Sequence, residues 1–291
     1  MPTFTTLEWV AGSISLFFTI ISVSCSSMTL YLINKIGMRS GYLRLIYSLA
    51  VMQLIYDIGL LNVCLYWIPA SRAIESFSTT FGGMGSNLWS NVISIVVVHI
   101  VVRLKSFDIN YYYSKMLILI TILSLGMAIA AVLTAPLKKG DSFDSTALII
   151  QDVYYYFRIA AIIFNVGCWV AVSRRLSIMG FKRKTGQGQS SLQAVMVLAD
   201  RLKWYPIVQV FSRSGAAFYD YKYGYGTNGY GDNGEKLHDI ALVCYAAFTP
   251  LAGIGYFVLF LKMQSEANEH FWITIENIKI YKLSNNEKAR K

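Results

Sequence analysis

Seven apolar runs, most of them long enough to cross a membrane, occupy most of the chain. They cover Leu7–Ile33, Tyr42–Ile68, Leu88–Val102, Met116–Ala135, Leu148–Val172, Trp204–Tyr221 and Ile240–Leu261. A helix needs about 20 mainly apolar residues to cross a bilayer. The short third run extends backward through Gly82, Gly83 and Gly85, and the sixth has an apolar lead-in at Leu192–Leu198. A backbone in lipid must satisfy its own hydrogen bonds, so the runs predict seven transmembrane helices.

The composition favours a membrane protein over a soluble one. The chain is 55% hydrophobic and 14% charged, whereas soluble domains carry roughly 25% charged residues. So little charge cannot cover the surface of a soluble globule. The net charge of +10 also raises nucleic-acid binding as an alternative. The basic residues lie between the apolar runs, so we expect a lipid bilayer and no nucleic acid as a partner.

The basic residues predict how the bundle is oriented. Of the 26 Lys and Arg residues, 19 fall at alternate connections and in the C-terminal tail, and five at the remaining connections. The other two lie within spans. Positive residues accumulate on the cytoplasmic side. We therefore expect an all-α membrane protein, a seven-transmembrane helix bundle over residues 1–262. Its N-terminus is outside, and a cytoplasmic tail covers residues 263–291.

Two segments outside the spans have a recognisable character. Tyr219–Gly234 is rich in Gly and Tyr and predicts a mobile outer loop, serving either as a linker or as a lid over a ligand. Glu266–Leu283 predicts a short amphipathic helix on the inner membrane surface, after span seven. Its apolar residues are spaced three or four apart, at Phe271, Trp272, Ile275, Ile278 and Tyr281.

Arginines fall inside two of the spans, where ionisable groups are costly and often functional. Arg158 lies in the outer third of the fifth run and Arg213 in the outer half of the sixth. Long basic side chains can extend to the outer headgroups. Alternatively, the two guanidinium groups point inward and bind an anionic ligand, since guanidinium suits carboxylate and phosphate. Trp67, Trp89 and Tyr155 either stack on that ligand or form the aromatic belt of the interface.

Five further residues are candidates for core polar contacts or for switching: Gln53, Asp57, His99, Pro206 and Pro250. Asp57 either binds a cation or is a hydrogen-bonded interior carboxylate, and His99 is either a protonation switch or structural. Gln53 is expected to hydrogen-bond between helices. Pro206 and Pro250 interrupt the backbone hydrogen bonding of their spans and predict kinks.

The cytoplasmic connections carry more positive charge than the orientation rule requires, most of all between the fifth and sixth runs. This surface suits either anionic lipid or a cytoplasmic protein. The residues predicted to face such a partner are Arg103, Lys105, Arg174, Arg175, Lys182, Arg183, Arg201 and Lys203.

Three segments resemble one family of receptors. RLKWYPIVQVF (Arg201–Phe211) is similar to the sixth helix of the cyclic-AMP-receptor-like group of G-protein-coupled receptors, where an Arg-Leu-Lys foot precedes an aromatic residue, Tyr and Pro. TPLAGIGYFVLF (Thr249–Phe260) resembles the seventh helix of that group and of its secretin-like relatives. SLAVMQLIYD (Ser48–Asp57) resembles the second-helix pattern.

The resemblance implies a cell-surface receptor, in the plasma membrane, for an extracellular small ligand. A small anion such as a cyclic nucleotide would be bound by Arg158 and Arg213, and the sixth helix would move to engage a heterotrimeric G protein. A seven-helix transporter or channel is the alternative.

No enzyme, metal site or cofactor is expected. The three His residues are far apart, and the four Cys residues lie inside apolar runs without metal-ligand spacing. A retinal cofactor would require a lysine inside Ile240–Leu261, and that run has none.

Overall fold

The computed structural model of the chain describes residues 6–38, 40–64, 72–103, 108–134, 145–183, 199–223, 242–264 and 268–269. In these ranges the regular structure is helical. The seven long helices are α1 (Thr6–Ile36), α2 (Gly41–Cys64), α3 (Arg72–Val101), α4 (Ile109–Thr134), α5 (Ser145–Arg183), α7 (Trp204–Tyr223) and α9 (Leu251–Met263). Short helical segments precede α7 at residues 199–202 and α9 at residues 242–248.

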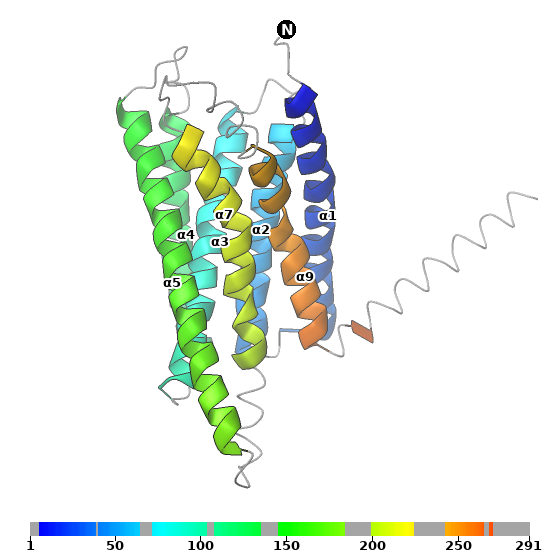
Figure 1. The fold of residues 1–291 in the computed structure, drawn as a ribbon, viewed down its shortest axis with the longest axis vertical. Coiled ribbons are helices and arrows are strands. Elements are labelled where there is room, and N and C mark those ends of the chain that lie inside the picture. The colour runs from blue at the N-terminus through cyan, green and yellow to red at the C-terminus, as the bar shows by residue number, and fades with distance from the viewer. Residues whose placement is uncertain are drawn as a thin grey trace, which may run out of the picture.

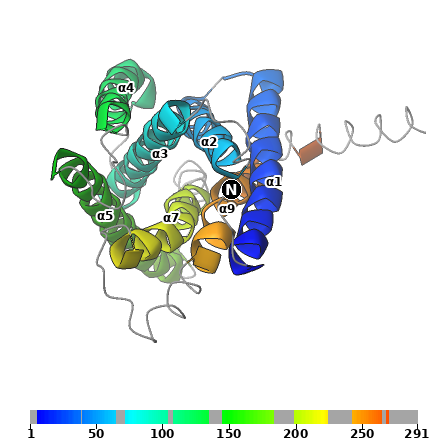
Figure 2. The same ribbon diagram turned by 90° about the horizontal axis from the view of Figure 1, so that it is seen from above.

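The helices form one bundle and alternate in direction (Figure 1). Seen from above, they follow one another around the bundle, with α9 beside α1 (Figure 2). We call the end where α1, α3 and α5 begin the N-terminal end, and the end where α9 stops the opposite end. The alternation puts the N-terminus and the end of α9 at opposite ends of the bundle, as a chain with seven spans requires.

Among the described residues, six helices are long and apolar enough to span a membrane, and the predicted seven-helix bundle is confirmed. These are α1 to α5 and the span Leu242–Met263, which consists of the short helical segment at residues 242–248 and α9. α7 does not meet this standard of hydropathy, although it lies within the bundle (Figure 2). Its buried polar residues, Gln209, Ser212 and Arg213, contribute to this lower hydropathy. The chain is a multi-pass membrane protein.

Five helices are longer than the apolar runs that predicted them, and α3, α5 and α7 among them extend in informative ways. α3 begins at Arg72, well before Leu88. The apolar run did not include its first half because this part is rich in Gly, Ser and Thr, which pack against α2. α5 continues to Arg183 and projects beyond the other helices at the opposite end (Figure 1). α7 reaches Tyr223 and so includes the start of the predicted outer loop. The predicted amphipathic helix at Glu266–Leu283 falls almost wholly outside the described residues.

Both predicted proline kinks are helix breaks in the structure. Residues 199–202 are helical, Lys203 is a turn, and α7 begins at Trp204, two residues before Pro206. Pro206 has no N–H to donate to the carbonyl of Leu202, which explains the break there. Thr249 and Pro250 form a turn before α9, where the same loss interrupts the seventh span. The first break lies at the start of the sixth span, and the second divides the seventh span into two pieces.

Glycines set how closely the helices pack. A Cβ atom at Gly82 would meet the backbone of Met52 and Tyr56, so α3 lies directly against the backbone of α2. A Cβ at Gly253 would meet the hydroxyl groups of Ser22 and Ser26 on α1. Glycines in spanning helices allow this close approach of neighbouring helices.

Replacing Gly82 with valine is expected to destabilise the bundle, because the new side chain can be accommodated only if the α2 backbone moves. Overpacking of this kind costs about 1–3 kcal/mol. Gly126→Val on α4 is the matched control, since a Cβ there has no neighbour within 4 Å. Thermal unfolding in detergent should show a lower Tm for the first variant only. Equal Tm values would contradict the close α2–α3 packing.

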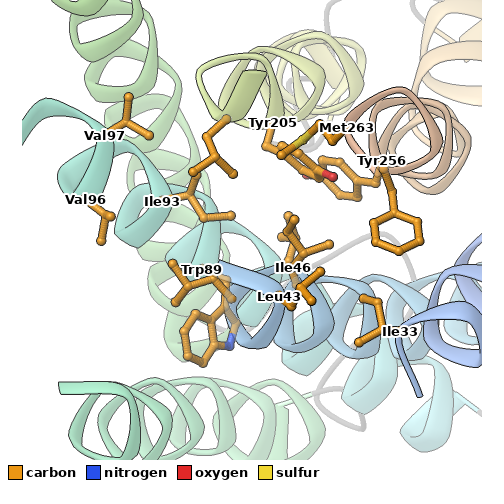
Figure 3. Packing of buried hydrophobic residues seen from close by; sticks show 14 of the residues in the cluster. Ile33, Leu43, Ile46, Trp89, Ile93, Val96, Val97, Tyr205, Tyr256 and Met263 are labelled. Atoms are coloured by element: carbon orange, nitrogen blue, oxygen red, sulfur yellow. The ribbon is translucent and has the colours of Figure 1, made fainter. Parts of the chain in front are cut away.

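The apolar core fills the opposite end of the bundle. It includes the last turns of α1 and α3, the first turns of α2 and the end of α9. Figure 3 shows Ile33, Ile46, Ile93, Tyr205 and Met263 around the centre of this cluster. The buried polar residues lie mainly in the middle of the bundle and towards its N-terminal end. The interior is therefore divided along its length into a polar part and an apolar part.

The orientation predicted from the basic residues can be tested with two matched substitutions. Thr185→Cys places a thiol in the basic connection after α5, and Thr227→Cys places one in the connection after α7. A membrane-impermeant thiol reagent applied to intact cells should label the second and leave the first unlabelled. Labelling of Thr185→Cys from outside would reverse the predicted topology.

Candidate functional site

Three charged side chains are buried within the described part of the bundle: Asp57, Arg158 and Arg213. They come from α2, α5 and α7. Burying a charge is costly unless hydrogen bonds or other charges compensate for it. The contacts of these three side chains therefore define the candidate site.

Arg213 lies at the middle of α7 with only 1% of its surface exposed. Its Nη2 donates to the Ser86 hydroxyl at 2.8 Å and to Gln53 Oε1 at 3.4 Å. Its guanidinium carbon lies 3.8 Å from the centre of the Tyr56 ring, which is a close cation–π contact. Nε and Nη1 make no hydrogen bond to any described residue. The arginine therefore points into the bundle rather than towards the headgroups.

Asp57 is fully buried and accepts three hydrogen bonds. The Ser22 hydroxyl donates to Oδ2 at 2.7 Å, and the Ser26 hydroxyl at 3.4 Å. Gln53 Nε2 donates to Oδ1 at 2.8 Å. Gln53 thus lies between the carboxylate of Asp57 and the guanidinium of Arg213, with its amide oriented towards both. The carboxylate is hydrogen-bonded inside the bundle, as one of the two alternatives from the sequence supposed.

A second set of contacts connects α7 with α3 and α9. Gln209 Nε2 donates to Asn87 Oδ1 and, at 3.3 Å, to the Ser86 hydroxyl. The Tyr256 hydroxyl of α9 donates to Gln209 Oε1. We call the whole set the polar network; its members are Ser22, Ser26, Gln53, Asp57, Ser86, Asn87, Gln209, Arg213 and Tyr256. It joins α1, α2, α3, α7 and α9 at the middle of the bundle.

The network ends against the apolar core. The Tyr256 ring stacks on the Tyr205 ring with centroids 5.7 Å apart, and Tyr205, in the first turn of α7, lies in the core (Figure 3). A change at Gln209 can therefore reach the packing around Tyr205 through a single side chain.

Arg158 is buried on α5, and its guanidinium lies 4.7 Å from the centre of the Tyr154 ring. A Cβ atom added at Gly83 on α3 would meet the Tyr154 hydroxyl and would lie 3.3 Å from two carbons of the Tyr56 ring. Arg213 stacks on that same Tyr56 ring. The two predicted arginines thus lie over two tyrosines, and the Tyr154 hydroxyl and the Tyr56 ring both lie beside Gly83.

The three aromatic residues predicted for the same site lie differently. Trp89 is buried on the side of α3 that faces α4, where it packs near Tyr113 (Figure 3). That position is separate from the two arginines, and we do not include Trp89 in the site. Tyr155 is half-buried on α5 beside Tyr156. Trp67 lies outside the described residues.

The basic residues at the opposite end are described only in part. Arg103 and Arg174 are exposed, and Arg175 is half-buried on α5. Arg201 donates from Nη1 to the carbonyl oxygen of Met263 at 2.8 Å, which connects the foot of α7 to the end of α9. Lys203 pairs with Asp200 at 2.7 Å.

Other members of the predicted set add little to the site. His99 is half-buried in the last turn of α3. Lys105 lies outside the described residues, and the side chains of Lys182 and Arg183 are not described. Within the described ranges, no group of three His, Cys, Asp or Glu residues gathers as a metal site would require.

Several members of the site were not singled out from the sequence, among them Tyr154, Ser86, Gln209 and Tyr256. A signal for two of them was present in the spacing. Tyr154 precedes Arg158 by four residues and Gln209 precedes Arg213 by four, as Gln53 precedes Asp57. Residues four apart share one helix face. Such polar pairs in apolar spans indicate faces that point inward.

Comparison with known proteins identifies the fold and no family. No family model matches the chain, and no curated protein matches it in sequence. Among solved structures, the crystal structure of squid rhodopsin superposes with a TM-score of 0.68 over 94% of this chain and 88% of that chain, at 15% sequence identity. The chain has the seven-helix fold of rhodopsin, the fold of G-protein-coupled receptors.

Proposed function

We propose that the protein is a cell-surface receptor that binds an extracellular small ligand and signals through α7 to a heterotrimeric G protein. The rhodopsin fold and the resemblance of Arg201–Phe211 to a receptor sixth helix support a receptor. We infer that the N-terminal end of the bundle faces outward, following the distribution of basic residues.

The observation that carries the proposal is the position of α7 between the two parts of the interior. At its middle, Gln209 and Arg213 belong to the polar network. At its foot, Tyr205 belongs to the apolar core, and the helix breaks at Lys203. A ligand that alters the network therefore acts on α7. The first turn of the same helix lies at the opposite end of the bundle. Binding shifts such an equilibrium only by its difference in affinity for the two states.

The ligand in this proposal carries an anionic group, with Arg158 and Arg213 as its partners. Their inward burial supports this assignment, because the alternative placed both side chains at the headgroups. The resemblance to cyclic-AMP receptors makes a cyclic nucleotide the first candidate. Guanidinium groups bind phosphate through directed, charge-assisted hydrogen bonds.

A transporter or channel is the alternative function, and the apolar core argues against it. A route for a polar solute would have to pass residues such as Leu49, Ile93 and Phe260, each of which is fully buried at the opposite end. In the described part of the bundle, the polar network stops at Tyr256. This arrangement suits a signal that crosses the membrane while the ligand does not.

The test is G-protein activation in membranes that contain the full chain, measured as guanine-nucleotide exchange against a panel of cyclic nucleotides and small anions. We expect at least one compound to give saturable exchange that membranes without the protein do not give. Uptake of the same compounds into vesicles, with no exchange on any G protein, would favour the transporter and overturn the proposal.

A further inference from the structure

We propose that the interior contains an oxyanion subsite formed by the guanidinium of Arg213 and the hydroxyl of Tyr154, at the point where Gly83 lets α3 lie against both α2 and α5. The inference rests on the receptor function proposed above and says where the ligand's anionic group binds. The chemical class is a carboxylate or a phosphate ester, two sources of the same kind of charged oxygen acceptor.

The first observation is the set of hydrogen bonds that Arg213 leaves unmade. Nη2 donates to Ser86 and Gln53, while Nε and Nη1 have no acceptor among the described residues. The stacking on Tyr56 covers a face of the guanidinium, and the N–H groups lie in its plane and stay available as donors. Buried donors without acceptors are rare and costly, most of all on a charged group.

The second observation is the Tyr154 hydroxyl. Its oxygen is inaccessible to solvent and makes no hydrogen bond to a described residue. It lies against the Cα of Gly83, close enough that any side chain at this position would clash with it. An ideal Cβ atom at Gly83 would lie 3.3 Å from two carbons of the Tyr56 ring, and Arg213 stacks on that ring. Ser86, which accepts a hydrogen bond from Arg213 Nη2, donates to the carbonyl oxygen of Gly83 at 3.1 Å. The Tyr154 hydroxyl and the Arg213 guanidinium therefore approach the same glycine of α3.

The chemistry of these donors favours an anion. Arg213 carries a permanent positive charge, so a cation would be repelled. The nearby carboxylate of Asp57 is already engaged by Ser22, Ser26 and Gln53, and Gln53 separates it from the arginine. Water could accept these hydrogen bonds but would add no negative charge beside the guanidinium. A carboxylate or phosphate ester supplies several acceptor oxygens together with the opposite charge.

The experiment measures anion binding directly and without a G protein. The full chain is purified in detergent, and its Tm is followed during titration with sodium acetate or sodium dimethyl phosphate at constant ionic strength. A ligand that binds only the folded state raises the Tm in a saturable manner. We expect saturation with at least one of the two salts, and the salt that binds more tightly identifies the group as a carboxylate or a phosphate ester.

Three variants locate the binding. Arg213→Gln should weaken the apparent affinity by about ten- to a hundredfold, because it removes charge-assisted hydrogen bonds. Tyr154→Phe keeps the ring under Arg158 and removes only the hydroxyl, which should cost about three- to tenfold. Gly83→Ala should weaken binding by displacing that hydroxyl. Tyr113→Phe is the matched control: it removes a hydroxyl bonded to Ser48, elsewhere in the bundle, and should leave the affinity unchanged.

If Arg213→Gln does not fold, Tyr154→Phe compared with Tyr113→Phe carries the test. No saturable Tm change in the wild type, or equal affinities for those two variants, would overturn the subsite. Ligand-driven nucleotide exchange would then still support the receptor function. Conversely, saturable binding that depends on Arg213 and Tyr154, without exchange on any G protein, would support the subsite and remove the receptor function.

Discussion

Replacing Arg213 with alanine is expected to abolish the response to ligand while the protein still reaches the cell surface. The substitution removes the hydrogen bonds to Ser86 and Gln53 and the cation that stacks on Tyr56. Leaving those partners unpaired costs about 1–3 kcal/mol of stability, a loss that the extensive packing of the bundle should tolerate. Loss of the anion partner removes binding itself. The measurement is concentration–response of nucleotide exchange alongside surface labelling.

Two controls separate a specific role from general damage. Arg213→Lys keeps the charge with fewer donors and should shift the response to higher ligand concentration without abolishing it. Ser214→Ala alters the next residue of α7, which is exposed and whose hydroxyl is bonded to the carbonyl of Phe211. It should behave as wild type. A full response from Arg213→Ala would show that the arginine is structural.

Joining α7 to α9 with a disulfide should block signalling completely. The geometry allows it: an ideal Cβ at Gly255 would lie 3.5 Å from Cβ of Val208, within the range of about 3.5–4.5 Å found in disulfides. The double variant Val208→Cys, Gly255→Cys would hold the first two turns of α7 against α9. If the foot of α7 must leave α9 for the receptor to signal, the oxidised protein cannot respond.

The reduced form of the same protein is the matched control, because it differs only in the bond. Reduction should restore nucleotide exchange, and ligand binding should persist in both forms if the polar network remains intact. The single variants, which cannot form the bond, should not depend on the redox state. Undiminished exchange in the oxidised protein would exclude a movement of α7 relative to α9.

Most of the fold could be predicted from the sequence because lipid imposes a simple rule on spanning helices. Hydropathy indicated α2, α4 and most of α1 directly. It failed in the first half of α3, where small polar residues such as Ser78 pack against α2 and face no lipid. It indicated α7 as the run Trp204–Tyr221, although this helix is less apolar than the other six and buries Gln209, Ser212 and Arg213. Hydropathy reports exposure to lipid, and these two segments face the interior of the protein.

The site was less predictable because its contacts join residues far apart in the chain. The sequence indicated Arg213 and Gln53 separately. It could not predict the hydrogen bond between them across the α2–α7 interface. Trp89 shows the same limit: an aromatic residue at a plausible depth packs beside Tyr113 of α4. Depth can be read from a hydropathy profile, whereas the rotation of a helix about its axis depends on its neighbours.

The outward position of α4 has a consequence for how this sequence can change over time. Most of its large apolar side chains, Leu119, Ile122 and Leu133 among them, are exposed at the surface of the bundle. Lipid contacts require apolar character and not a particular shape, so substitutions among Leu, Ile, Val and Phe should be nearly neutral there. Over long descent α4 can lose all recognisable similarity while the contacts of α2, α3 and α7 are retained. A saturation-mutagenesis map should therefore show α4 as the most permissive helix towards apolar replacements.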